Sequence, residues 1–155
     1  MEKNRSSQMT GFSILSITKH KEILSDDLQQ NINFIITLTG NSSDFIIRKF
    51  QEAKGLPMAI VYINGLTDTE LINDSIMNPI LSAVEAITAQ SRTLHELFSD
   101  LKDKVITVNG TNTISKIDDL ISALYKGDTV ILADGLDEAI SASSAKWVQR
   151  GVEEE

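Results

Sequence analysis

The sequence predicts an α/β protein with two small subdomains, each a short mixed β-sheet packed with helices. The 155 residues are 41% hydrophobic and 23% charged, which is a globular composition. Apolar residues recur at helical spacing in some segments and form short β-branched runs in others. Both halves also share an order of helix, glycine, strand and Asn-Gly or Asp-Gly turn. We expect a loosely ordered lead-in at 1–24, subdomains at 25–90 and 91–152, and a frayed end at 153–155.

The first subdomain is expected to begin with a helix capped by Ser25 and closed by Gly40, since apolar residues between them fall on one helical face. Two strands follow, over 45–50 and 58–63. The second strand has no polar alternation, which is typical of a central strand with both faces covered. The run 67–70 (Thr-Asp-Thr-Glu) predicts a capping box with Thr67 as N-cap. Pro79 should end or kink the helix that this box opens, or start a second helix as its first residue.

The second subdomain is expected to run helix, strand, helix and hairpin. A second capping box at 93–96 opens its first helix, and 105–108 should form a short strand. An amphipathic helix through 114–124 should end at Gly127, before a buried strand at 129–133. That strand-helix-strand succession predicts a right-handed βαβ unit. Asp134-Gly135 should then turn the chain into a weaker returning strand at 136–143.

Composition excludes several classes of function. The absence of cysteine excludes disulfides, thiol catalysis and Cys-ligated zinc, and a net charge of −8 argues against nucleic acid as a partner. The longest apolar run, 58–63, is far shorter than the roughly 20 residues of a transmembrane helix. No signal-peptide core follows the polar N-terminus. A soluble intracellular domain is the expectation.

The sequence holds no recognisable catalytic or metal-binding arrangement. His20 and His95 are the two histidines, and neither lies near a carboxylate cluster with ligand spacing. Gly-x-Ser-x-Gly, P-loop and dinucleotide-binding motifs are absent. The three carboxylates of 134–138 lack the spacing of an EF-hand loop. We therefore expect a protein that is not an enzyme, with no metal and no cofactor.

Polar residues near the ends of the predicted strands are candidates for binding a small molecule, because ligands of open α/β sheets usually lie there. Arg48 and an aspartate would suit the two charges of an amino acid. A local role is the alternative: the aspartates would cap turns, and Arg48 would pair with a nearby carboxylate. The candidate ligand-binding residues are Asp44, Arg48, Tyr62, Asn64 and Asp134.

Three short sequence blocks are more informative about the protein family than hydrophobic periodicity is. The blocks 41–48 (NSSDFIIR), 59–66 (AIVYINGL) and 127–135 (GDTVILADG), with Trp147 and Arg150-Gly151 after them, resemble the N-terminal hydrophilic domain of GerA-family spore germination proteins. These are the A subunits of nutrient germinant receptors in spore-forming Bacillota. The resemblance extends over about 25–154, although Asn64 stands where the family usually has aspartate and Ala133 where a larger apolar residue is common.

The resemblance implies a receptor subunit of the spore inner membrane, with this domain on the core, or cytoplasmic, side. Its partners would be the B and C subunits, its own membrane region and, in the full receptor, further copies of itself. The chain would then be a fragment of a longer membrane protein, with 153–155 leading toward that absent region.

Two functions follow for such a domain. It could be an assembly and signal-coupling module in which Trp147 and Arg150 contact neighbouring subunits, since Trp and Arg are favoured interface anchors. Alternatively, it could bind a germinant (amino acid, sugar or nucleoside) directly in a cleft between the subdomains.

Overall fold

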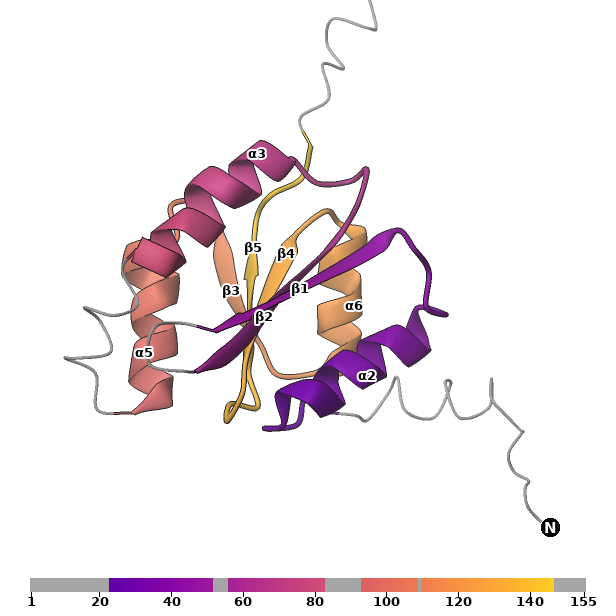
Figure 1. Cartoon of the computed structure of the whole chain (residues 1–155), viewed down its shortest axis with the longest axis horizontal. Coiled ribbons are helices and arrows are strands. Elements are labelled where there is room, and N and C mark those ends of the chain that lie inside the picture. Colours follow the sequence, from indigo (N-terminus) through magenta and orange to yellow (C-terminus); the bar gives the residue numbers. More distant parts are fainter. Residues whose placement is uncertain (1–22, 52–55, 83–92, 109, 147–155) are drawn as a thin grey trace, which may run out of the picture.

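The fold is a five-stranded antiparallel sheet with helices on both faces (Figure 1). A computed structural model describes residues 23–51, 56–82, 93–108 and 110–146. The strand order is β1-β2-β4-β5-β3, and all four neighbouring pairs are antiparallel. The strands are β1 (Phe45–Gln51), β2 (Pro57–Ile63), β3 (Thr111–Ile114), β4 (Thr129–Ala133) and β5 (Ala139–Ala142).

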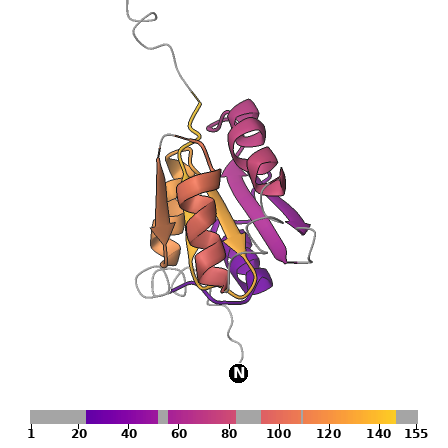
Figure 2. The ribbon, with the colours of Figure 1, turned by 90° about the vertical axis from the view of Figure 1, so that its left-hand side faces the viewer.

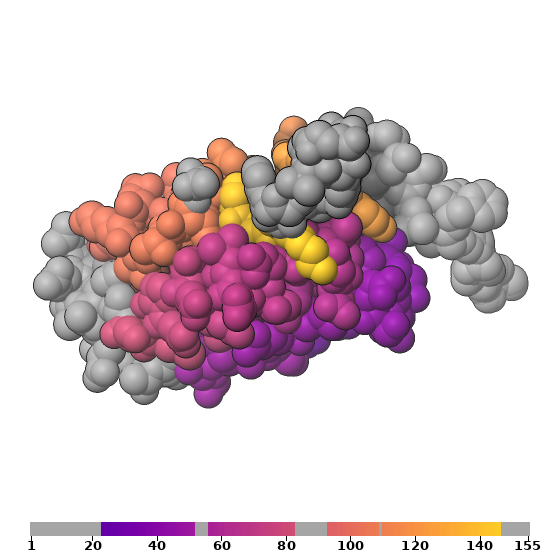
Figure 3. Space-filling model, turned by 90° about the horizontal axis from the view of Figure 1, so that it is seen from above, coloured from indigo at the N-terminus to yellow at the C-terminus, as the bar shows by residue number. Residues whose placement is uncertain are grey.

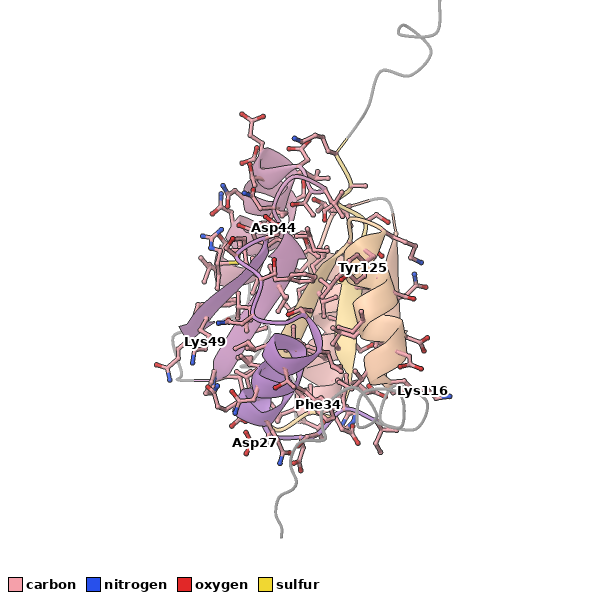
Figure 4. The ribbon with its side chains drawn as sticks, turned by 90° about the vertical axis from the view of Figure 1, so that its right-hand side faces the viewer. Asp27, Phe34, Asp44, Lys49, Lys116 and Tyr125 are labelled. Atoms are coloured by element: carbon pink, nitrogen blue, oxygen red, sulfur yellow. The ribbon has the colours of Figure 1, made fainter. Side chains whose placement is uncertain are left out.

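Two helices lie on each face of the sheet. On one face, α2 (Leu28–Leu38) and α6 (Ile117–Tyr125) lie side by side (Figure 4). On the other face, α3 (Thr69–Ile72) continues into the π-helical turn η2 (Asn73–Met77), and α5 (Leu94–Asp100) continues into η3 (Leu101–Val105). Figure 2 shows α5 lying across the front of the sheet with α3 beside it.

Side-chain alternation along the central strands produces two hydrophobic cores. In β2, Met58, Ile60 and Tyr62 face α3 and α5, whereas Ala59 and Val61 face α2 and α6. All six side chains from 58 to 63 are at most 7% exposed. The prediction of a central, doubly covered β2 is therefore confirmed, and so are the strands at 45–50 and 129–133.

The expectation of two short mixed sheets is wrong in this structure. β2 pairs with β4 through Met58↔Ala133 and Val61↔Val130, so the sheet is continuous across the expected subdomain boundary. Every pairing is antiparallel. Hydrophobic runs identify strands but do not specify their partners, because pairing depends on contacts that are distant in the sequence.

The predicted βαβ unit also needs correction. Residues 105–108 are not a strand: Val105 ends η3, and the strand that precedes α6 is β3. β3 and β4 are both antiparallel to β5, which lies between them, so α6 connects two parallel strands that are not neighbours. The position of β5 between β3 and β4 does not follow from the order of the elements along the chain.

Two helix starts differ from the prediction by one or two residues. The N-cap of α2 is Asp27, whose side chain accepts from the Gln30 N–H, and Ser25 lies before it. The N-cap of α3 is Asp68 and not Thr67, because the Thr67 hydroxyl donates instead to the Ile63 carbonyl. The capping box of Thr93 and Glu96 is confirmed.

Pro79 lies in the helical residues 78–82 directly after η2 and does not end the helix. Proline has no N–H, so it cannot donate to the carbonyl of Ser75 four residues earlier. That carbonyl accepts instead from the Thr107 N–H, at 3.2 Å. Pro79 thus leaves an acceptor that ties the α3–η2 helix to the segment after η3.

Candidate functional site

The segment that follows β5 is held against two loops at one end of the sheet. We call this region the C-terminal junction and define it as residues 64–68, 127–129 and 143–146. Ala145 forms an isolated antiparallel bridge with Thr67. The Lys146 N–H donates to the Leu66 carbonyl at 2.8 Å, and the Asp68 N–H donates to the Ser144 carbonyl at 2.8 Å. The chain therefore continues beyond β5 as an ordered, hydrogen-bonded segment.

Buried hydroxyl groups hold this segment to the start of β4. Ser144 is 0% exposed, and its Oγ donates to the Gly127 carbonyl at 2.9 Å. The same Oγ lies 2.7 Å from the hydroxyl of Thr129, which is also 0% exposed. Buried polar groups are costly unless they are paired, and both hydroxyls have partners within the junction.

Gly127 allows its backbone to lie close to Ala145 and to the Leu66 carbonyl. Its φ is +94°, and a Cβ at this position would lie 2.9 Å from the Ala145 Cβ and 3.0 Å from the Leu66 carbonyl oxygen. Both the left-handed backbone and the missing side chain are therefore needed. Next to it, burial raises the pKa of Asp128, and the nearby Lys126 partly offsets that rise.

The junction is also connected to helix α3. The Asp68 carboxylate accepts from the Leu71 N–H at 3.1 Å, so the residue whose N–H binds Ser144 also caps the helix. In the space-filling view from above, the yellow residues at the end of the described chain lie directly beside the magenta helix (Figure 3). Residues 143–146 are therefore connected by hydrogen bonds to the start of α3.

Two of the ligand-binding candidates lie together at this same end of the molecule. Asp44 precedes β1 and Asn64 follows β2, and the Asn64 N–H donates to the Asp44 carbonyl at 2.7 Å. The Asp44 N–H also forms a hydrogen bond within its own turn, because it donates to the Ser42 hydroxyl oxygen at 3.2 Å. Both side chains are exposed, and Figure 4 shows Asp44 in the upper half of the view.

The other three candidates lie elsewhere. Arg48 is exposed in the middle of β1 and donates to the Asn73 side chain at 3.4 Å, not to a carboxylate. Tyr62 is 7% exposed in the core beneath α3 and α5. Asp134 follows β4 at the opposite end, roughly 20 Å along the strands from Asn64 by the rise per residue. Its carboxylate accepts from the Leu28 N–H at 2.9 Å and so caps α2.

Trp147 and Arg150 lie outside the described residues. The sequence predicts Gly127 as a helix end and Thr67 as a helix start, but it does not indicate that the residues of the C-terminal junction lie together. A small hydroxyl residue such as Ser144 carries no sequence signal of its own burial.

A polar hollow of about 290 Å³ lies on the α5 face at the β3 edge of the sheet. We call it the α5–β3 hollow, and it is lined by His95, Phe98, Ser99, Lys102, Thr113, Glu138 and Ile140. His95, Ser99 and Lys102 are spaced four and three residues apart, which places them on one side of the α5–η3 helix. This helical spacing is the feature of the sequence that could have indicated that these three side chains lie together.

The described ranges contain no cluster of His, Asp or Glu able to hold a metal ion. None of the helices in the same ranges has both the length and the apolar character needed to cross a membrane.

Three comparisons place this architecture among known proteins. Residues 33–155 match the family model described as Bacillus/Clostridium GerA spore germination protein. The chain is 32% identical over 134 residues to Spore germination protein KA of Bacillus subtilis (strain 168) and 28% identical over 115 residues to Spore germination protein GerLA of Bacillus cereus. These two alignments include 85% and 74% of this chain, but only 24% and 22% of the length of the two relatives.

The fold has a solved counterpart. The crystal structure of the N-terminal domain of the A subunit of the Bacillus megaterium spore germinant receptor GerK3 matches with a TM-score of 0.67 and 29% sequence identity. The match covers 84% of this chain and 50% of that one. By the sequence alignments above, the chain spans about a quarter of the length of Spore germination protein KA and of GerLA. It belongs to the GerA spore germination protein family, and its structure corresponds to the N-terminal domain of a germinant receptor A subunit.

Proposed function

We propose that this domain is an assembly and signal-coupling module of a germinant receptor A subunit and acts in nutrient-triggered spore germination. The observation that carries the proposal is the C-terminal junction. Residues 143–146 are bound to two loops of the folded domain and lead directly to the position of Trp147. A hydrogen-bonded exit can pass a conformational change in either direction, whereas a flexible linker would absorb it.

In this proposal the full-length protein lies in the spore inner membrane, with this domain on the core side. A curated relative from Bacillus subtilis that is 26% identical over 132 residues carries the name uncharacterized membrane protein YfkQ, which agrees with a membrane location for the longer protein. The B and C subunits and the protein's own membrane region are the proposed partners. Trp147 and Arg150 are the proposed contacts.

The direct test is to loosen the exit without disturbing the fold. Insertion of Gly-Ser-Gly between Lys146 and Trp147 in the full-length protein should leave its amount in spores unchanged and abolish nutrient-triggered germination. The same insertion between Asn41 and Ser42, in the loop between α2 and β1, is the matched control and should have a much smaller effect. Normal germination with the first insertion would exclude coupling through the junction.

Trp147→Ala tests the proposed contact residue separately. The variant should fold normally and be present at normal levels, but the spores should respond poorly to nutrient. Interface hot spots are enriched in Trp and typically cost about 2 kcal/mol or more when truncated. A normal germination rate would remove Trp147 from the proposal while leaving the junction itself in place.

Direct binding of a small germinant is the second candidate, and a specific observation favours it. The α5–β3 hollow has a polar lining drawn from three separate segments of the chain. The set of Asp44, Arg48, Tyr62, Asn64 and Asp134 is a weaker proposal, because only Asp44 and Asn64 are adjacent. If that set binds ligand, Arg48→Ala should abolish binding in an amide NMR titration, and an unchanged affinity would exclude Arg48.

A further inference from the structure

The turn between β2 and α3 contains an asparagine that is followed directly by a glycine. Residues 64–66 form this turn, and the Leu66 N–H closes it by donating to the Ile63 carbonyl at 3.2 Å. Asn64 and Gly65 are both exposed. Asparagine is a thermally labile residue, because its side-chain amide can react with the backbone nitrogen of the next residue. The turn therefore places a reactive pair of residues on the surface of the C-terminal junction.

Both reacting groups of this pair are unused by the fold. The Asn64 backbone N–H donates to the Asp44 carbonyl at 2.7 Å, but the Asn64 side-chain amide has no hydrogen-bond partner among the described residues. The Gly65 N–H likewise donates to no residue in the part of the chain that the structure describes. A nitrogen that is held in a hydrogen bond must lose that bond before it attacks, whereas the Gly65 nitrogen needs no such step.

The backbone of the turn also requires the residue that hinders this reaction least. Gly65 has a φ of +97°, which residues with a side chain rarely adopt. Because glycine has no Cβ, the Gly65 nitrogen can approach the Asn64 side chain closely. A Cβ at position 65 would meet no atom of a non-neighbouring residue within 4 Å, so the turn and not the packing demands glycine here.

We propose that Asn64 is a site of spontaneous covalent modification, which converts it to aspartate and isoaspartate. The Gly65 nitrogen loses its proton to solvent base and bonds to the Asn64 Cγ, while the Cγ–Nδ2 bond breaks and ammonia leaves with a proton from solvent. The resulting five-membered imide then takes up one water. Addition at Cγ breaks the new bond and gives aspartate, whereas addition at the main-chain carbonyl carbon breaks the original peptide bond and gives isoaspartate. Nothing is oxidised or reduced: one water is consumed and one ammonia is released.

The two products should affect the C-terminal junction differently. Aspartate adds one negative charge and leaves the backbone as it was. Isoaspartate adds one methylene carbon to the main chain between Ile63 and Leu66, within the turn that the Leu66 N–H closes. The Leu66 carbonyl accepts from the Lys146 N–H at 2.8 Å, so a shift of this turn weakens a bond that holds residues 143–146. The consequence for germination rests on the proposed coupling function.

The experiment is incubation of the 155-residue chain at mildly alkaline pH, followed by digestion after glutamate at mildly acidic pH and mass spectrometry. Digestion yields residues 53–70 as a peptide in which Asn64 is the single asparagine. Conversion raises the mass of this peptide by about one dalton, and chromatography separates the aspartate and isoaspartate forms.

The internal control for this rate is Asn33. It is exposed in α2 and is followed by Phe34, whose N–H lies within the helix. We expect Asn64 to convert at least about tenfold faster than Asn33, which corresponds to about 1.4 kcal/mol in activation free energy. Equal rates at the two asparagines would overturn the inference.

Variants separate the chemistry from the fold. Asn64→Gln should abolish the conversion over the same incubation, because its longer side chain would have to form a six-membered ring. Gly65→Ala places a Cβ beside the attacking nitrogen and should slow the conversion several-fold. The amide spectrum shows whether this second variant keeps the turn, since its φ strains an alanine. Undiminished conversion in a folded Gly65→Ala variant would also overturn the inference.

Hydrogen exchange at the Lys146 N–H tests the effect on the junction. Exchange should be several-fold faster in the isoaspartate form than before incubation, because the bond to the Leu66 carbonyl opens more often. Asn64→Asp is the matched control, since it adds the charge without the methylene, and its exchange at Lys146 should stay close to that of the unchanged protein. Conversion without faster exchange would retain the modification site and remove its effect on the junction.

Storage of spores tests the consequence for germination. Spores with full-length Asn64→Gln should lose their response to nutrient more slowly than spores with the unchanged protein. An equal loss in both would exclude an effect on germination and leave the mass-spectrometric result in place. The coupling function is tested independently by the insertion after Lys146.

Discussion

The C-terminal junction and the α5–β3 hollow are both built on β5, but they use their polar groups in opposite ways. In the junction, the hydroxyls of Ser144 and Thr129 are fully buried and bonded to each other, and the Ser144 hydroxyl also donates to the Gly127 carbonyl. In the hollow, His95 and Glu138 make no hydrogen bond or ion pair within the described ranges. Satisfied buried groups stabilise one arrangement, whereas groups left unused by the fold can bind something else.

The difference predicts which region tolerates substitution. Changes in the junction should lower the free energy of unfolding, because they break contacts that exist in the folded chain. Changes at the partly exposed polar residues of the hollow should leave the free energy of unfolding nearly unchanged, since surface substitutions usually stay within about ±0.5 kcal/mol.

Gly127→Ala should have the largest effect. The left-handed φ of +94° costs a residue with a Cβ about 1–2 kcal/mol, and the added carbon would push Ala145 and Leu66 apart. Overpacking adds about 1–3 kcal/mol, so we expect a total loss of about 2–5 kcal/mol in urea unfolding. Gly40→Ala is the control, because Gly40 also has a positive φ but has nothing within 4 Å of its added Cβ. Equal losses in both variants would show that the contact with Ala145 is unimportant.

Ser144→Ala should have the next largest effect. It removes the donor to the Gly127 carbonyl and leaves that carbonyl and the Thr129 hydroxyl with fewer partners in a buried site. We expect a loss of about 1–3 kcal/mol in the same measurement. Ser143→Ala is the adjacent control, since Ser143 is exposed, and it should change stability by less than about 0.5 kcal/mol. A neutral Ser144→Ala would contradict the account of the junction as a satisfied buried network.

Asp128→Asn should have the smallest effect, and its sign is informative. Burial raises the folded-state pKa of Asp128 above its ordinary value of 3.8, so folding favours the protonated form. The stability contributed by this group is complete below pH 3.8 and is lost as the pH rises through the folded-state pKa. Asparagine cannot ionise, so the variant should be slightly more stable at pH 7. Between pH 3 and pH 7, the free energy of unfolding should fall less with rising pH in the variant than in the unchanged protein. A variant less stable than the unchanged protein at pH 7 would contradict the desolvation of Asp128.

The local patterns of the sequence were sufficient to locate most helices and strands and to indicate the protein family. Hydrophobic periodicity located β1, β2, β4, α2 and α6, and the capping box at Thr93 located the start of α5. The blocks around Asp44–Arg48 and Gly127–Gly135 indicated the GerA family, which the family model confirms over residues 33–155. All of these signals are short in sequence range, since they depend on turns, caps and alternation.

The candidate site depended on contacts that local patterns do not contain. Asp134 was expected in a ligand site, but it caps α2, which begins 106 residues earlier in the chain. Ser144 gave no signal, because its burial arises only when the exit segment lies against the loop at Gly127.

The sequence by itself therefore determined the composition of the two cores, the identity of most helices and strands, and membership of the GerA family. Tertiary structure alone decided that the strands form a single antiparallel sheet in the order β1-β2-β4-β5-β3 and that β5 separates β3 from β4. It also decided which polar residues meet. The physical reason is that side-chain alternation specifies the faces of a strand, whereas the choice of neighbouring strand depends on how the whole chain closes its hydrophobic core.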